Sequence, residues 1–383
     1  MPIETFEQFV KRILTIVFWL LIIAPMILAP VLFIIIESGL IEFPLNPYAL
    51  IAAPDLVMPI QLELMASSFF KVVVFPGFTT AALVATVMIL FERKFLAKIN
   101  LRVGPLYAGK FEGFLQPIAD LFKLISKELI IPKKADKTFF VAIPFMLFAV
   151  VSALLSVIPI GPSTYVARSP ISLLIFFAIM GFFPIIVLLA AWSSSNKFSF
   201  IGGLRALHQM ISYEIPLILV AVSVVILSGS LDLYQIVIAQ KTVWFIVPMF
   251  LGACIFYVAS LAELERIPFD MPEADTEIVA GWLTEYSGMF FGVIQLAIYV
   301  KFYALSALFT VLFLGGWSGP GILPPEAWFL MKTLIVMVFM ILPRGFNPRI
   351  RIDMMVKIGW KYLILISIIN LLIAIVAASI LSG

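Results

Sequence analysis

The sequence has very little cysteine, histidine or charge. Cys254 and His208 are the only residues of their kinds among 383. This excludes a disulfide scaffold, and it excludes the zinc, haem and iron–sulfur sites that one chain builds from several such ligands. Charged residues make up 12%, against about 25% in soluble domains, and hydrophobic residues make up 63%. We therefore predict an all-α polytopic membrane protein, surrounded by the lipid bilayer and without a nucleic-acid partner.

Nine hydrophobic runs are long enough for membrane-spanning helices, which need about 20 mostly apolar residues. The basic residues predict how these helices are oriented. With the N-terminus inside, 20 of the 25 Lys and Arg residues lie in inside segments, as the positive-inside rule expects. We therefore predict an inside N-terminus and an outside C-terminus. The runs cover residues 13–36, 69–91, 139–159, 171–191, 211–229, 244–262, 289–314, 326–343 and 360–381.

Two of the predicted inside segments have motifs of structural interest. Residues 92–138 are basic, and apolar residues at helical spacing predict an amphipathic helix over 111–128. Such a helix is typical of either a membrane-surface anchor or a docking platform for a partner. In residues 192–210, the Ser and Asn residues at 193–196 predict a turn, and the two glycines at 202–203 allow close backbone approach.

The third inside segment, residues 263–288, is acidic. It has seven carboxylates against a single base, Arg266. Neighbouring carboxylates raise one another's pKa and titrate as a coupled set, which suits proton binding and relay. A solvated acidic loop is the alternative, but apolar residues at 267–269 and 278–280 favour partial burial. The carboxylates are Glu263, Glu265, Asp270, Glu273, Asp275, Glu277 and Glu285.

Among the acidic and basic residues, three lie more than two positions from the end of a predicted span. Glu214 is the clearest, because a carboxylate inside a membrane is costly and is a functional candidate by default. The alternative is a Glu close enough to the interface to reach water. Pro216 follows it and removes a backbone donor. Lys301 and Lys332 either pair with a carboxylate or extend towards the interface, and the mid-span position of Lys301 favours pairing.

Motifs for catalysis are missing from the sequence. There is no phosphate-binding glycine loop, no supported nucleophile–base arrangement and no metal-ligand spacing. We therefore assign no catalytic residue and no metal to this chain, and we expect no complete active site of its own.

Several motifs together resemble one family. On these motifs the chain, over about residues 70–381, resembles the quinone-chamber membrane subunit of respiratory complex I, the family of mitochondrial subunit 1. That family has eight spans, so we expect an N-terminal addition with one extra span in residues 1–68 and a family core in residues 69–383. The motifs are LRVGP at 101–105, LQPIADLFKLISKE at 115–128, SSSNKFSFIGGLRALHQMISYEIPL at 193–217, ERIPFDMPEADTEIVAGWLTEYSGM at 265–289 and PRIRIDMMVKIGWK at 348–361.

The resemblance implies a non-redox subunit that couples electron transfer to proton or sodium translocation. It assigns the quinone-chamber surface to Glu92, Arg93, Arg102, Asp120 and Lys123. By the same motif matching, the coupling carboxylates are Glu214, Asp270, Glu273, Asp275, Glu277 and Glu285. This chain alone would bind no cofactor, and quinone would be shared with its partners. The implied partners, in a prokaryotic cell membrane, are peripheral-arm quinone-site and iron–sulfur subunits, antiporter-like subunits and small membrane subunits.

The chain also departs from the family pattern. Asp275 stands for the usual Glu, Phe290 for a Lys and Leu129 for an acidic residue. Ile298 replaces another Glu and Lys301 follows on the same span, which questions the usual proton path there. These departures leave open an equivalent subunit of a membrane-bound hydrogenase or sulfur-reducing complex. A free-standing secondary transporter is a remoter alternative, since the paired repeats expected of it are not found in the sequence.

Overall fold

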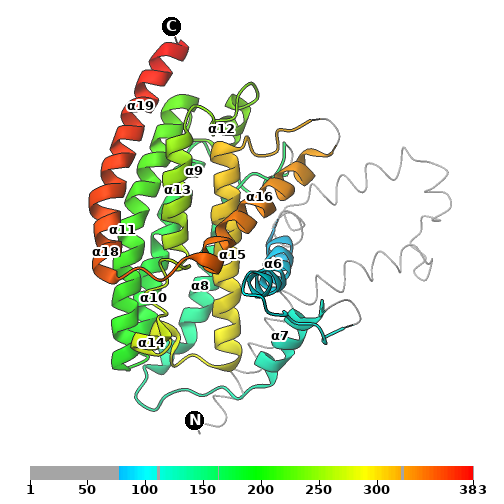
Figure 1. Ribbon diagram of the computed structural model, residues 1–383, viewed down its shortest axis with the longest axis vertical. Coiled ribbons are helices and arrows are strands. Elements are labelled where there is room, and N and C mark those ends of the chain that lie inside the picture. Colours follow the sequence, from blue (N-terminus) through cyan, green and yellow to red (C-terminus); the bar gives the residue numbers. More distant parts are fainter. Residues whose placement is uncertain (1–76, 110–112, 163, 321–322, 383) are drawn as a thin grey trace, which may run out of the picture. The chain divides into compact units, whose positions relative to one another are not determined.

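The computed structural model describes residues 77–109, 113–162, 164–320 and 323–382, and within them all regular structure is helical (Figure 1). The all-α prediction is confirmed for this part of the chain. The predicted span 13–36 and the segment 1–68 lie outside the described residues. The chain divides into two units, and the second unit starts at Ala85. Helix α6 (Phe78–Ile99) crosses this boundary, and all later helices belong to the second unit.

The helices of this unit range from long apolar ones to short ones of a single turn. A 3-10 turn lies at Gly281–Leu283 and a π-helical turn at Ile358–Leu363. In chain order the helices are α7 (Gln116–Ser126), α8 (Lys137–Val157), α9 (Ser172–Met180), α10 (Phe182–Ser193), α11 (Lys197–Ser228), α12 (Leu233–Ala239), α13 (Phe250–Glu263), α14 (Asp275–Ile278), α15 (Gly288–Phe313), α16 (Pro325–Ile341), α17 (Pro343–Phe346), α18 (Ile352–Lys357) and α19 (Ile364–Ser382).

Six stretches of the described chain are long and apolar enough to cross a membrane. Each coincides with a run predicted from the sequence, which supports a polytopic membrane protein. The full number of spans and their orientation stay predictions. The six stretches are Lys137–Val157, Ser172–Ser193, Lys197–Ser228, Gly288–Phe313, Pro325–Phe346 and Ile352–Ser379.

The stretch that contains α9 and α10 is interrupted within the predicted membrane region. Gly181 separates the two helices. Pro184, in the first turn of α10, has no N–H to continue the hydrogen-bond ladder across the break. The predicted run 171–191 is therefore one span made of two half-helices.

α11 is longer than its predicted run, 211–229. Its 32 residues extend about 48 Å, whereas the hydrocarbon core of a bilayer is about 30 Å thick. It starts where the Asn196 side chain accepts a hydrogen bond from Phe198 N at 3.0 Å. Lys197 and Arg205 end the hydrophobic run, but the helix includes both residues. Most of segment 192–210 is therefore helical and extends beyond the membrane core.

α13 is shorter than a span, although the run 244–262 predicts one. Its 14 residues extend about 21 Å. The chain continues from it through residues 264–287 as a largely buried segment with only short helical turns. This segment contains six of the seven carboxylates of residues 263–288, and α15 follows it. α15 is the most deeply buried of the six long apolar stretches of the described chain.

Candidate functional site

A buried ion pair joins α13 to α15. Nζ of Lys301 lies 2.8 Å from Oε1 of Glu263 and 3.0 Å from the carbonyl oxygen of the same residue. The two side chains are 2% and 0% exposed. Lys301 is residue 14 of the 26 in α15, about 20 Å from the start of the helix. Lys301 therefore lies far from either end of α15, and it pairs with a carboxylate as its mid-span position predicts.

Glu214 on α11 lies beside this pair. It is half-buried and within electrostatic range of both Glu263 and Lys301. Its Oε1 is 3.4 Å from the point where a Cβ on Gly181 would stand, so its carboxyl group faces the break between α9 and α10. Nζ of Lys301 also lies 3.8 Å from the ring centroid of Phe183 on α10. Side chains from four helices thus bring two carboxyl groups and one ammonium group together.

Glu265 connects the group of Glu214, Glu263 and Lys301 to the other carboxylates of the acidic segment. It is buried directly after α13, and Nε1 of Trp282 donates a hydrogen bond to its Oε2 at 3.3 Å. Burial, and then the negative charges of Glu273 and Asp270, raise the pKa of Glu265 to about 8, while Lys301 acts in the opposite direction. Near neutral pH a proton therefore resides on a carboxyl group that responds to its acidic neighbours.

Three predicted coupling residues of the segment, Asp270, Glu277 and Glu285, contact polar residues from other inside segments. Glu273 interacts with Glu265, as described above. The side chain of Asp275 lies outside the described residues. The segments predicted to share one side of the membrane therefore contact one another. The nitrogen–oxygen distances are 2.9 Å for Asp270 with Arg349, 2.6 Å for Glu277 with Arg205 and 2.6 Å for Glu285 with Asn196.

Gln209 and two glycines hold the acidic segment against α11. Nε2 of Gln209 donates to the carbonyl oxygens of Ala262 at 2.6 Å and Phe269 at 2.7 Å. A Cβ on Gly202 would stand 2.6 Å from Cα of Gly281, a distance that leaves no room for a side chain. Gly281 has a φ of +56°, a conformation that favours glycine. The close backbone approach expected at Gly202 is confirmed.

A second charge cluster surrounds Glu92, whose side chain is 1% exposed. Its carboxylate accepts hydrogen bonds from Nη1 of Arg266 at 2.8 Å and from the Tyr299 hydroxyl at 3.0 Å. Arg344 donates to the second carboxylate oxygen. Cζ of Arg266 lies 4.1 Å from the ring centroid of Phe302. One carboxylate and two guanidinium groups thus connect α6, the acidic segment, α15 and α17.

The remaining predicted chamber residues lie at or near α7. Arg93 and Asp120 form an ion pair. Arg102 and Lys123 are exposed, and no ion pair of either is found among the described residues. α7 covers 116–126 of the predicted helix 111–128, has no buried residue and leaves its apolar face exposed. Both interpretations of this helix, a surface anchor and a docking platform, require such a face.

The family resemblance gave no role to three residues that these clusters contain, Glu263, Glu265 and Arg344, although the first two are among the seven carboxylates of the acidic segment. Glu263 is the last residue of an apolar helix, where a carboxylate next to a span could have been noticed. Glu265 was counted only as one member of an acidic segment. Arg344 is 252 residues from its partner Glu92, and no local sequence pattern reports such a contact.

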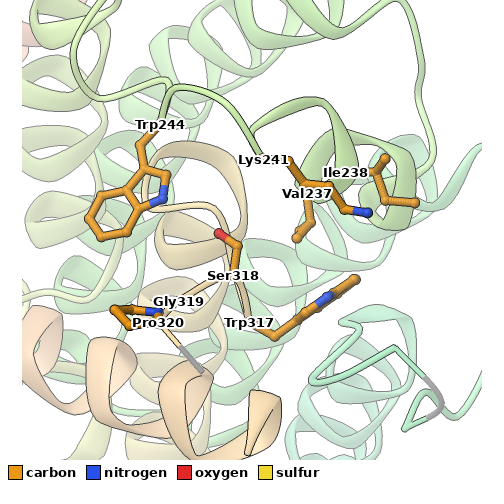
Figure 2. Close-up of a pocket in the computed structure, with 8 residues that line it drawn as sticks. All are labelled: Val237, Ile238, Lys241, Trp244, Trp317, Ser318, Gly319 and Pro320. Carbon is orange, nitrogen blue, oxygen red and sulfur yellow. The ribbon is translucent and has the colours of Figure 1, made fainter. Parts of the chain in front are cut away.

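A separate pocket of about 540 Å³ lies beyond the end of α15 opposite the acidic segment (Figure 2). Trp244, Trp317 and Lys241 are among its lining residues, and none of the predicted site residues lines it. Nζ of Lys332 lies 4.3 Å from the ring centroid of Trp244. Lys332 was expected to pair with a carboxylate or to reach the interface. No ion pair of Lys332 is found among the described residues, and it donates to the carbonyl oxygens of Leu314, Gly316 and Ser318, which follow the end of α15.

Comparison with known proteins identifies the family. The profile of the family described as NADH dehydrogenase matches residues 70–375. The chain belongs to the NADH dehydrogenase family. This confirms the family to which the sequence motifs pointed, and the match begins after the segment predicted to be an N-terminal addition.

Several relatives of this NADH dehydrogenase family member are named as the same subunit of NADH-quinone oxidoreductase. The relative from Anoxybacillus flavithermus is 43% identical over 288 residues, which are 74% of this chain and 86% of that protein. The relative from Brevibacillus brevis is 41% identical over 311 residues, 80% of this chain and 90% of its own length. A third, from Syntrophobacter fumaroxidans, is 43% identical over 300 residues, 76% and 90% of the two chains.

Proposed function

We propose that this chain is the non-redox membrane subunit of a complex-I-like quinone oxidoreductase, and that it couples electron transfer to translocation of protons or sodium ions. Family membership supports this proposal, because the relatives are named as subunits of NADH-quinone oxidoreductases. A single Cys and a single His leave the chain without the ligands for a redox metal centre of its own. Electrons would therefore pass through partner subunits.

The observation that carries the proposal is a series of charges that runs from the acidic segment into the helices. Asp270 and Glu273 act electrostatically on Glu265, and Glu265 interacts with Lys301. Lys301 pairs with Glu263 between two helices. In low-dielectric surroundings a change of charge on one group alters the protonation of the next. A reaction that changes the charge near the acidic segment would therefore be transmitted to carboxyl groups inside the membrane.

Quinone has a polar headgroup and an apolar tail, and the surface around α7 offers partners for both. The ion pair of Arg93 with Asp120 provides hydrogen-bonding groups beside the exposed apolar face of this helix. Arg102 and Lys123 add exposed positive charge nearby in the sequence. Glu92 precedes Arg93 and is fixed by its own cluster. We assign the chamber surface to these residues, with quinone shared with partner subunits rather than bound by this chain alone.

The partners that fit this role are peripheral-arm quinone-site and iron–sulfur subunits, antiporter-like subunits and small membrane subunits. The peripheral arm would dock on α7 and the acidic segment. The apolar faces of the outer helices, such as α19 with its exposed aliphatic side chains, would meet lipid or other membrane subunits. The apolar helices support an integral membrane protein, and we place it in a prokaryotic cell membrane.

An equivalent subunit of a membrane-bound hydrogenase or sulfur-reducing complex is the alternative. Ile298 and Lys301, the departures from the family pattern, are the sequence observations that keep it open. Both alternatives use the same fold and the same coupling role. The relatives named above favour the quinone enzyme.

Purification of the tagged chain from the membranes of its own host tests this proposal. We expect it to copurify with iron–sulfur subunits and to reduce quinone in the resulting complex. A partner with nickel-ligating cysteines and hydrogen-dependent activity would favour the hydrogenase alternative. Isolation of the chain alone, with normal ion transport, would contradict the subunit assignment.

A further inference from the structure

Two carboxyl groups and one ammonium group meet among side chains of α10, α11, α13 and α15. They belong to Glu214, Glu263 and Lys301. A net charge is costly in such surroundings, because little water is present to solvate it. The three groups together are neutral only when one of the two carboxyl groups carries a proton. The charge balance therefore predicts that this trio holds one proton.

The contacts of Lys301 indicate which carboxyl group holds that proton. Nζ of Lys301 contacts Oε1 of Glu263 at 2.8 Å, the geometry of an ammonium group paired with a carboxylate. Glu263 is therefore the ionised member. Glu214 has no ion pair among the described residues, so it is the member that retains the proton.

We propose that Lys301 is the switch of a one-proton relay between Glu263 and Glu214, a role that rests on the proposed coupling function. A proton that arrives on Oε2 of Glu263 forms an O–H bond there and removes the negative charge. Lys301 then turns to Glu214, whose O–H bond breaks and whose proton leaves towards the opposite side. One proton enters, one proton leaves, and the ammonium group keeps all of its protons.

Local structure provides the features that such a relay needs. Oε2 of Glu263 is buried and has no hydrogen-bond partner among the described residues, so it is available to accept a proton. Glu265, which follows two residues later and also interacts with Lys301, is the donor on the side of the acidic segment. On the other side, the carboxyl group of Glu214 faces Gly181, between α9 and α10, and Pro184 in the next turn has no N–H for the hydrogen-bond ladder.

The Lys301 side chain is suited to the switching step. It has four flexible methylene groups, and its ammonium group lies against the face of Phe183 at 3.8 Å. This contact stabilises a cation without fixing it to one carboxylate. Lys332, the other lysine within a span, donates to three carbonyl oxygens and has no carboxylate to exchange. The two lysines thus form a natural pair of test and control positions.

Infrared difference spectroscopy of the purified resting complex counts protonated carboxyl groups directly. For these two glutamates, the wild type should show one such signal, and Glu214→Gln should remove it. Lys301→Met should add a second signal, because both carboxyl groups must then be neutral. Glu263→Gln should abolish the signal of Glu214, because Lys301 then pairs with Glu214 alone. An unchanged count in Lys301→Met, or a Glu214 signal that persists in Glu263→Gln, would overturn the proposal.

Ion translocation per electron separates switching from a structural role. Lys301→Met should lower this ratio about tenfold or more, since a lost charge balance alters proton affinity by more than one pKa unit, or 1.36 kcal/mol. The double variant Lys301→Met with Glu263→Gln has no unpaired charge and should restore assembly but not translocation. Translocation restored together with assembly would show that the pair is only structural. The control Lys332→Met should leave the ratio per assembled complex unchanged.

These results also distinguish this inference from the proposed function on which it rests. The infrared count is made without turnover and does not depend on coupling. If the count fails but Glu214→Gln still abolishes translocation, the coupling function stands and the switch is wrong. If the count is as expected and translocation is unaffected by every variant, the coupling function is wrong.

Discussion

Nη1 of Arg266 lies 2.8 Å from Oε2 of Glu92, across 174 residues of sequence. Both side chains are nearly inaccessible, at 7% and 1% exposure, so the contact joins α6 to the start of the acidic segment inside the protein. Arg344 contacts the same carboxylate from a more exposed position. Glu92 thus serves as a shared anchor for two basic residues that the sequence places far apart.

Replacement of Glu92 tests this anchor. Glu92→Gln leaves Arg266 buried without its counter-charge. Breaking a buried pair costs about 3–5 kcal/mol of folding stability. We expect about 3 kcal/mol, because the second partner of Glu92, Arg344, can reach water. We expect the assembled complex to be much less abundant in membranes. Asp353→Asn is the matched control, since its ion pair with Arg351 is exposed and should contribute little. Equal abundance of the two variants would contradict the anchoring role.

Glu265 predicts a pH dependence of stability. Its pKa of about 8 lies above the ordinary value of 4.5, so the folded state binds the proton more tightly than the unfolded state. The stability from this proton is complete below about pH 4.5 and is lost as the pH rises to about 8. Thermal unfolding of the purified complex should therefore occur at lower temperature as the pH rises through this window.

Two variants separate this effect from general alkaline instability. Glu265→Gln keeps a neutral side chain at every pH and should make the pH dependence weaker. Glu277→Gln, at a carboxylate of the same segment that is 50% exposed, should leave the slope as in the wild type. An unchanged slope in Glu265→Gln would show that another group is responsible.

The exposed position of Arg102 leads to a prediction about the kinetics of quinone reduction. If it borders the quinone chamber, Arg102→Ala should lower kcat/KM for quinone by about tenfold, the low end of the effect of charge on association. Lys134→Ala removes a base exposed later in the same segment and should have little effect. Equal kinetics of Arg102→Ala and the wild type, in intact complex, would place the chamber elsewhere.

The backbone contact between Gly202 and Gly281 predicts a packing defect. A Cβ at position 202 would overlap the backbone of Gly281 in the acidic segment. Gly202→Ala should therefore lower the folding stability of the protein by about 1–3 kcal/mol. We expect less assembled complex and faster proteolysis within residues 264–287. Gly292→Ala provides the control, because its Cβ would meet only the flexible side chain of Leu124 at 3.3 Å. Equal protease resistance of the two variants would contradict the close contact.

The sequence predicted the long helices well because their hydrophobic runs are local features. The run 289–314 corresponds to α15, and 139–159 to α8. The start of α11 was not predicted. Hydropathy indicates membrane burial, and it does not indicate that a helix continues past charged residues such as Lys197 and Arg205. The helix is instead fixed there by its Asn196 cap and by the contact of Gly202 with the acidic segment.

Within the candidate site, individual residues could be predicted but their partners could not. Glu214 and Lys301 are recognisable because charged groups within spans are rare. The pairing of Lys301 with Glu263 joins positions 38 residues apart, and the burial of Glu265 depends on how the segment folds against α11. Such contacts are set by tertiary packing, for which a single sequence has no local signal.

Ion translocation per electron in the Glu214→Gln variant tests the central claim, that carboxyl groups in this chain couple the redox reaction to ion movement. The purified complex would be reconstituted in liposomes, with quinone reduction and ion uptake measured together. We predict that electron transfer continues while translocation per electron is lost, because Gln cannot bind and release a proton. Wild-type translocation by fully assembled Glu214→Gln complex would contradict the account.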